Sequence, residues 1–374
     1  MHRFRFHLLF ATCCFFVLTG CSSVSEPEKA VFSLSPGESV TAEQAERIGN
    51  TLSLYPNNTQ FAIALIEDSS ATFYGAYRDA DTLKVTRNTD AVFEIGSISK
   101  VFTSTLLAHS TVDGTVEPDS SIRPYLDVSM KDSVDVTYTQ LSNHTSGLPR
   151  LPPGFLWNMI WNGNNPYAYF GDEEMRAFLR EEIELESNPG EEHLYSNLGS
   201  GLLGYALEQA EGESYEELLQ SRIFNPLEMT RSTAVRENIE EHLVAGLNKR
   251  GNETSNWDLN ALAGAGAIYS TVRDLSRFAL ANFDPSNEVY ELQRQPTLNI
   301  EEGREVAKGW FISTRSSGDR WYWHNGGTGG YRTIMILDPN HNRGVIVLSN
   351  ISAGHSEAAE IDRLGFDLMG TLYQ

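Results

Sequence analysis

Apolar runs of strand length gather at the two ends of this chain of 374 residues, and that distribution limits the folds open to it. Short apolar runs bounded by turn-forming residues are typical of buried β-strands. The runs span residues 61–66, 71–77, 309–314, 320–324, 331–337 and 344–350, with a hairpin turn at 338–340. The middle of the chain has helical periodicity instead, at 172–182, 198–209 and 215–223.

Strands from both ends and helices from the middle predict an α+β fold. We expect one antiparallel sheet, flanked by helices and built from both termini, with a mostly helical region inserted between its halves. A capping-box pattern predicts a first helix over 41–54, and an amphipathic pattern predicts a last helix over 356–372. A functional site is expected in the cleft between the two parts. The expected division is a domain over 41–374, with an α/β part at about 41–112 and 256–374 and a helical insert at about 113–255.

The first twenty residues (1–20) have the pattern of a signal peptide, in which Arg3 and Arg5 precede an apolar run over 8–18. This run is shorter than the about 20 residues that span a bilayer. The segment that ends in Cys21 resembles the lipobox of bacterial lipoproteins, which implies cleavage before Cys21 and a lipid on its thiol. Ordinary secretion and an uncleaved membrane anchor are the alternatives.

The resemblance to bacterial lipoproteins also implies a location. Ser22 after the cysteine implies the outer membrane of the cell envelope, facing the periplasm. Residues 21–40 are rich in Ser, Glu and Pro, so we expect a flexible tether between the lipid and the domain. The membrane is thus an expected partner, contacted through the lipid anchor on Cys21.

Charge and cysteine content exclude several classes of function. The formal net charge is −22, from 28 Lys and Arg against 50 Asp and Glu, so we expect no nucleic-acid partner. Cys21 is the only cysteine expected in the mature chain, which excludes an internal disulfide and a cysteine nucleophile. No metal and no cofactor are expected, since the histidines show no metal-site spacing. A Gly-x-Ser-x-Gly elbow is also missing, which excludes an α/β-hydrolase.

The first candidate catalytic pattern is Ser97-x-x-Lys100 at the entry to an apolar helix. Residues three apart lie on one helix face, so the lysine amine can reach the serine hydroxyl. A hydroxyl becomes a strong nucleophile when a base takes its proton, and a lysine with a lowered pKa can be that base. A solvent-facing lysine beside a capping serine would satisfy the same pattern.

Two further segments carry candidate site residues. Tyr195 could relay protons to or from a cationic lysine, and Asn197 could orient both the lysine and a substrate amide. The other segment is His324-Asn325-Gly326-Gly327, where glycines would let substrate lie close to a strand edge. The backbone N–H of Gly327 could form an oxyanion hole with that of Ser97. An ordinary helix cap at Asn197 and a glycine-rich hairpin are the alternatives.

Taken together, these motifs resemble the class C β-lactamases, the low-molecular-mass penicillin-binding proteins and the family VIII-type esterases. The Ser-x-x-Lys, Tyr-x-Asn and third-motif segments occur in that family's order, over about residues 60–370. Segments 141–149, 224–230 and 264–271 also resemble it. The resemblance implies a β-lactamase/transpeptidase-like fold and an acyl-enzyme on Ser97. It also implies Lys100 and Tyr195 as catalytic residues.

One residue departs from the family pattern. His324 stands where relatives often carry a lysine that faces the substrate carboxylate. Because histidine titrates near neutral pH, we expect His324 to tune the selection of carboxylate-bearing substrates between about pH 5 and 8, with Arg332 as the next candidate for this contact. The departure favours a D-Ala-D-Ala carboxypeptidase or endopeptidase acting on cell-wall peptides. An esterase, a β-lactamase and a non-catalytic penicillin-binding module are the alternatives, and the expected partner is a small-molecule or peptide substrate.

Overall fold

The computed structural model describes residues 39–131 and 134–373. The expected signal peptide, Cys21 and all but the last two residues of the expected tether lie outside the described residues. Among those that are described, no helix is both long and apolar enough to cross a membrane.

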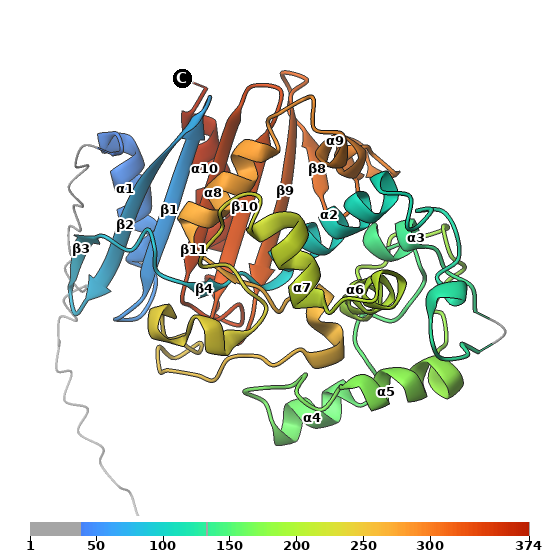
Figure 1. Ribbon diagram of the computed structural model, residues 1–374. Coiled ribbons are helices and arrows are strands. Elements are labelled where there is room, and N and C mark those ends of the chain that lie inside the picture. The colour runs from blue at the N-terminus through green and yellow to red at the C-terminus, as the bar shows by residue number, and fades with distance from the viewer. Residues whose placement is uncertain (1–38, 132–133, 374) are drawn as a thin grey trace, which may run out of the picture. The chain divides into compact units, whose positions relative to one another are not determined.

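A nine-stranded antiparallel sheet forms the centre of the described domain (Figure 1). Its strands come only from residues 60–86 and 298–349, and the two groups join where β1 pairs with β11, with Phe61 opposite Ser349. The α+β fold with an antiparallel sheet built from both ends is therefore confirmed. From edge to edge the strands are β3 (Thr82–Thr86), β2 (Ser70–Asp79), β1 (Gln60–Glu67), β11 (Arg343–Ser349), β10 (Arg332–Asp338), β9 (Arg320–Gly327), β8 (Phe311–Thr314), β7 (Arg304–Val306) and β6 (Leu298–Glu301).

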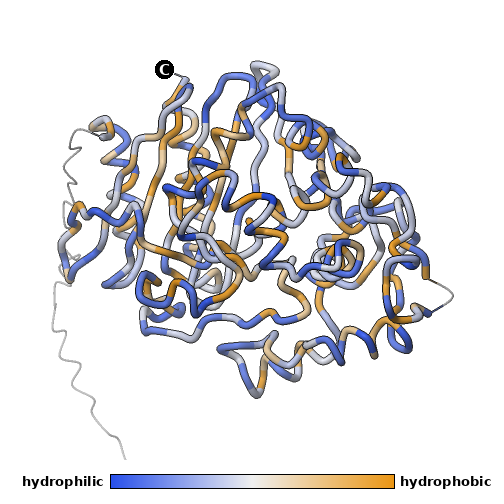
Figure 2. Tube along the Cα trace, viewed as in Figure 1, coloured by the Kyte–Doolittle hydropathy of each residue, from blue (hydrophilic) through white to orange (hydrophobic). Residues whose placement is uncertain are grey.

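Helices cover both faces of this sheet, which explains why its central strands are almost continuously apolar (Figure 2). Along β1, Phe61 and Ile63 belong to the core shared with α1 (Ala42–Leu52) and α10 (Ala359–Thr371). The alternate residues Ala62 and Ala64 belong to the larger core on the other face. That core also holds side chains of α2 (Ser99–Val112), α6 (Asn197–Glu211) and α8 (Val272–Ala281).

Shorter elements complete the described chain. The predicted helix over 172–182 is α5 followed by a π-helical turn, and the one over 215–223 is α7 with a similar turn. The two-residue strands β4 and β5 form a separate pair, in which Glu94 lies opposite Tyr269. The remaining bounds are α3 (Tyr138–Ser142), α4 (Phe155–Trp161), α5 (Asp172–Ala177), α7 (Tyr215–Leu219), α9 (Glu288–Arg294), β4 (Phe93–Glu94) and β5 (Tyr269–Ser270).

Candidate active site

Ser97 lies in a short 3-10 turn, Gly96–Ile98, that leads directly into α2. Gly96 has φ +54°, and a Cβ at this position would come within 2.7 Å of the backbone nitrogen of Gly327. The turn therefore needs a glycine, both for its backbone conformation and for its close approach to the end of β9. This approach places the Ser97 turn against the third predicted motif.

The structure brings the predicted pair Ser97 and Lys100 together. Lys100 Nζ lies 3.0 Å from Ser97 Oγ and donates to the carbonyl of Ala265 at 2.6 Å. Its side chain is 2% exposed, and it forms no ion pair with a carboxylate of the described residues. Burial, assisted by the charge of Arg150, holds the pKa of Lys100 well below its usual range. A neutral amine in this position can accept the Ser97 proton.

Tyr195 lies beside this pair. The Lys100 amine lies 5.1 Å from the centroid of its ring, and the Arg150 guanidinium lies 5.0 Å from the same centroid. Burial raises the pKa of Tyr195 to about 12, although Ser97 and Arg150 act in the opposite direction. Tyr195 is thus a neutral phenol near pH 7 and can donate a proton, whereas Lys100 is the group that can accept one.

Asn197 contacts a residue that the sequence did not single out. Its side-chain amide donates to the hydroxyl of Tyr167 at 2.8 Å, and its Oδ1 is buried without a hydrogen-bond partner among the described residues. The helix cap is the neighbouring Ser196, whose hydroxyl accepts from the backbone N–H of Gly199. The Oδ1 atom is thus a buried acceptor without a partner among the described residues, and Nδ2 donates to Tyr167 where the sequence predicted an orienting contact with Lys100.

His324 differs from the sequence expectation. Its side chain is 1% exposed, its Nδ1 lies 2.6 Å from the carbonyl of Asn325, and its Nε2 is buried without a partner among the described residues. Burial and the nearby Lys100 lower the pKa of His324 to about 3. The expected change of charge between pH 5 and 8 is therefore wrong. The sequence alone shows neither the burial of this ring nor its proximity to the lysine.

Asn325 is also placed differently from the expectation. Successive strand residues point to opposite faces, and the Asn325 side chain donates to Asp362 of α10 at 2.7 Å. Arg332, the next candidate for a substrate carboxylate, is bound to the same Asp362. Both side chains are thus engaged with α10, and the structure does not bring the Asn325 side chain to Ser97.

The two glycines of the third motif let β9 pass close to the Ser97 turn. A Cβ on Gly326 would lie 1.9 Å from the carbonyl oxygen of Ile95, so no larger residue fits there. The backbone nitrogen of Gly327 faces Gly96, next to Ser97. The oxyanion hole formed by the N–H groups of Ser97 and Gly327 stays a prediction.

Sequence reasoning missed the contributions of His144 and Arg150. His144 is buried and accepts from the backbone N–H of Ser196 at 3.2 Å, and the centroid of its tilted ring lies 4.3 Å from that of Tyr195. Arg150 is exposed and forms no ion pair with the described residues, so its charge faces the site uncompensated. The segment over 141–149 was noticed only as a family resemblance, and Arg150 follows it directly.

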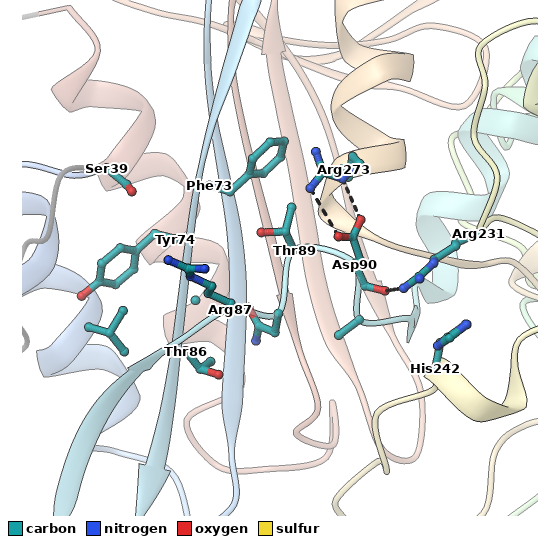
Figure 3. A pocket seen from close by; sticks show the side chains of 14 residues that line it. Ser39, Phe73, Tyr74, Thr86, Arg87, Thr89, Asp90, Arg231, His242 and Arg273 are labelled. Carbon is teal, nitrogen blue, oxygen red and sulfur yellow. Dashed lines mark hydrogen bonds and ion pairs between the residues drawn. The ribbon is translucent and has the colours of Figure 1, made fainter.

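A hollow of about 660 Å³ lies between β2, β3 and α8, and none of the candidate catalytic residues lines it (Figure 3). Arg273 binds Asp90 through two nitrogens, at 2.6 and 3.3 Å, and Arg231 donates to the carbonyl of Asp90 at 2.7 Å. These two arginines are thus already paired within the protein, unlike Arg150 beside Tyr195.

A serine and a buried lysine 3.0 Å apart, beside a neutral tyrosine and against the end of β9, are the arrangement of a serine hydrolase. A sequence profile described as "Beta-lactamase" matches residues 60–369. The chain belongs to the beta-lactamase family.

Relatives of known name agree with this membership. D-alanyl-D-alanine-carboxypeptidase/endopeptidase AmpH of Escherichia coli K12 is 27% identical over 317 residues, which are 78% of this chain and 79% of that protein. The fold resembles the β-lactamase/D-alanine carboxypeptidase of Yersinia pestis complexed with citrate, with TM-score 0.71 and 23% identity over 88% of this chain and 96% of that one. It also resembles a class C β-lactamase of Rhodobacter sphaeroides, with TM-score 0.73 and 18% identity over 89% of this chain and 100% of that one.

Proposed function

We propose that the enzyme forms an acyl-enzyme on Ser97, with neutral Lys100 as the base. The contact between the Lys100 amine and Ser97 Oγ, made by a buried lysine without a carboxylate partner, is the observation that carries the proposal. Lys100 takes the hydroxyl proton while Oγ bonds to the substrate carbonyl carbon. The leaving group then departs with a proton supplied through Tyr195, and water hydrolyses the acyl-enzyme.

The proposed substrates are cell-wall peptides that end in D-Ala-D-Ala, cleaved by carboxypeptidase or endopeptidase action. The similarity to AmpH over most of both chains supports this substrate class. A peptide of this kind carries a terminal carboxylate, and the Arg150 guanidinium, which forms no ion pair with the described residues, provides a cation beside Tyr195. Asn197 Oδ1 provides an acceptor for a peptide N–H.

An esterase is the second candidate, and the neutral state of His324 favours it. The site has no fixed cation at position 324, so the uncharged acyl group of a small ester would meet no unpaired charge there. A β-lactamase is the third. A substrate panel of D-Ala-D-Ala peptides, short-chain p-nitrophenyl esters and a chromogenic cephalosporin separates these activities. Turnover of the esters alone would contradict the peptidase.

Covalent labelling tests the nucleophile and the base separately. A fluorescent penicillin or a fluorophosphonate should label Ser97, as mass spectrometry of the labelled peptide would show. Lys100→Ala should abolish this labelling, because the serine then has no adjacent base. An adduct on another residue would contradict the nucleophile, and labelling of Lys100→Ala at the parent rate would contradict the base.

We further propose that the mature chain is a lipoprotein, anchored by a lipid on Cys21 to the outer membrane and facing the periplasm. The lipobox-like segment before Cys21 supports this proposal. The native protein should partition into detergent and carry a diacylglyceryl group at Cys21, and Cys21→Ser should remove both properties. A soluble native form without the modification would contradict the anchor.

A further inference from the structure

One short helix carries half of the strongly exposed large apolar side chains of the described residues. Helix α4 begins at Phe155 and ends at Trp161, and only Phe155 is buried. Single exposed apolar residues are normal on soluble proteins, but a contiguous group marks an interaction surface. The exposed members and their exposed fractions are Leu156 68%, Trp157 69%, Met159 46%, Ile160 69% and Trp161 79%.

The sequence that contains α4 has no charged side chain, and the nearest charged residues along the chain are Arg150 and Asp172. Residues 151–170 contain no Asp, Glu, Lys, Arg or His, although charged residues make up 21% of the whole chain. The polar side chains within this stretch are amides and tyrosine hydroxyls, such as Asn158 and Asn162 on the helix and its C-cap. A surface of this kind can leave water without desolvating an ion.

The helix is connected to the candidate active site through its buried end. The ring of Phe155 lies 4.7 Å from that of Tyr167, and the Tyr167 hydroxyl accepts the hydrogen bond from Asn197. Figure 1 shows α4 beside α5, at the edge of the described domain away from the strands of the large sheet. Helix α4 is therefore linked to the site residue Asn197 through the side chains of Phe155 and Tyr167.

We propose that α4 docks on the surface of a zwitterionic lipid bilayer and holds the part of the domain that carries Tyr167 and Asn197 near that surface. Trp side chains favour the membrane–water interface, where their rings meet the headgroups, and Leu and Ile enter the acyl boundary. This contact is additional to the lipid proposed on Cys21. It is a contact of the folded domain, made by Leu156, Trp157, Ile160 and Trp161.

Charge and chain length favour a bilayer over a second copy of the protein. Two copies would each carry a formal net charge of −22 and repel each other, whereas a zwitterionic surface carries no net charge. The 18 residues from Cys21 to Ser39 can reach at most about 60 Å, at the roughly 3.3–3.6 Å per residue of a fully extended chain. That reach exceeds the size of a domain of this length, so an anchored chain can present α4 to its membrane.

Quenching of tryptophan fluorescence tests the docking directly. The mature full-length protein is mixed with phosphatidylcholine vesicles that contain doxyl-labelled lipid, and co-flotation confirms its binding. Two of the six tryptophans lie on α4, so we expect quenching of up to about a third of the emission. The double variant Trp157→Phe/Trp161→Phe should lose the doxyl-dependent quenching, which assigns the signal to α4.

Two further variants separate docking from folding and from self-association. Leu156→Ser/Ile160→Ser should abolish the quenching and keep the thermal midpoint, because both side chains are exposed. Ile300→Ser, at an exposed apolar residue outside α4, should leave the quenching unchanged. Unquenched tryptophans in protein that co-floats, or the lack of any co-flotation, would overturn the proposal. A loss of dimer in Leu156→Ser/Ile160→Ser, seen by sedimentation without quenching, would assign α4 to a second copy instead.

Discussion

Replacement of Arg150 by glutamine should raise the pKa of Lys100 and move the acid limb of the activity profile to higher pH. The exposed guanidinium contributes to the lowered pKa of the buried lysine, and glutamine removes the charge while keeping much of the side-chain length. Only the unprotonated amine can take the Ser97 proton. The rate therefore rises with pH through the pKa of Lys100, and a higher pKa requires a higher pH.

The structure sets the largest possible separation of the two charges, and therefore the smallest interaction at a given dielectric constant. Both cationic groups lie about 5 Å from the centroid of the Tyr195 ring, so they are at most about 10 Å apart. Two unit charges about 10 Å apart interact by about 0.4 kcal/mol in water and about 1.7 kcal/mol at an effective dielectric constant of 20. These energies correspond to pKa changes of about 0.3 and 1.2 units. Because Arg150 is exposed to water, we expect the lower half of this range at physiological salt.

The assay is kcat/KM against pH for a neutral p-nitrophenyl ester, which has no carboxylate for Arg150 to bind. Arg150→Lys is the matched control, since it keeps the charge and should leave the acid limb in place. High salt should reduce the difference between the parent and Arg150→Gln. An unchanged limb in Arg150→Gln, or an equal shift in Arg150→Lys, would refute the electrostatic reasoning.

Three further predictions concern the neighbouring residues. Ser97→Ala should lower kcat on the order of 10³- to 10⁶-fold at an unchanged thermal midpoint, and a smaller loss in steady-state assays would argue against the nucleophile. For the parent, we compare kcat/KM for a carboxylate-bearing substrate with kcat/KM for a neutral ester. The ratio of the two should show no step near pH 6.5, because burial lowers the pKa of His324 to about 3. A step near pH 6.5 that disappears in His324→Gln would show that His324 does titrate there. Gly96→Ala should destabilise the fold by about 1–3 kcal/mol in urea titrations, because its Cβ would meet the Gly327 nitrogen at 2.7 Å. Gly114→Ala is its control, since Gly114 also has a positive φ but no atom within 4 Å of a Cβ, and an equal loss in both variants would leave only backbone strain as the cause.

The central strands were predictable because both of their faces are buried. β1, β10 and β11 are continuous apolar runs, and their hairpin turn carries ordinary turn residues. The edge strands β3 and β6 were missed because most of their side chains are exposed and show no apolar pattern, and β7 was missed because it has only three residues. The predicted end of β9 at His324 was too early, since Gly326 and Gly327 continue the ladder with β10.

The candidate site was predictable where its geometry is local. The three-residue spacing of Ser97 and Lys100 fixes their contact within one turn of chain, whatever the rest of the fold. The neutral state of His324 depends on the burial of its ring. The direction of the Asn325 side chain depends on which face of β9 packs against α10. The sequence alone shows neither. Arg150 and His144 reach Tyr195 only through tertiary packing, so their isolated positions in the chain gave no signal.

The pairing of β1 with β11 has a consequence for biosynthesis. Residues 60–67 leave the ribosome early, yet one of their two partner strands is complete only when residue 349 has been made. Until then β1 can form only its hairpin with β2, and one edge of that hairpin stays unpaired. The Ser97 turn rests on β9, which also belongs to the last part of the chain, so the nascent protein stays without its catalytic centre until synthesis is nearly finished. A chain that completes its sheet this late stays incompletely folded for most of its synthesis, and in that state a translocation channel or a chaperone can bind it.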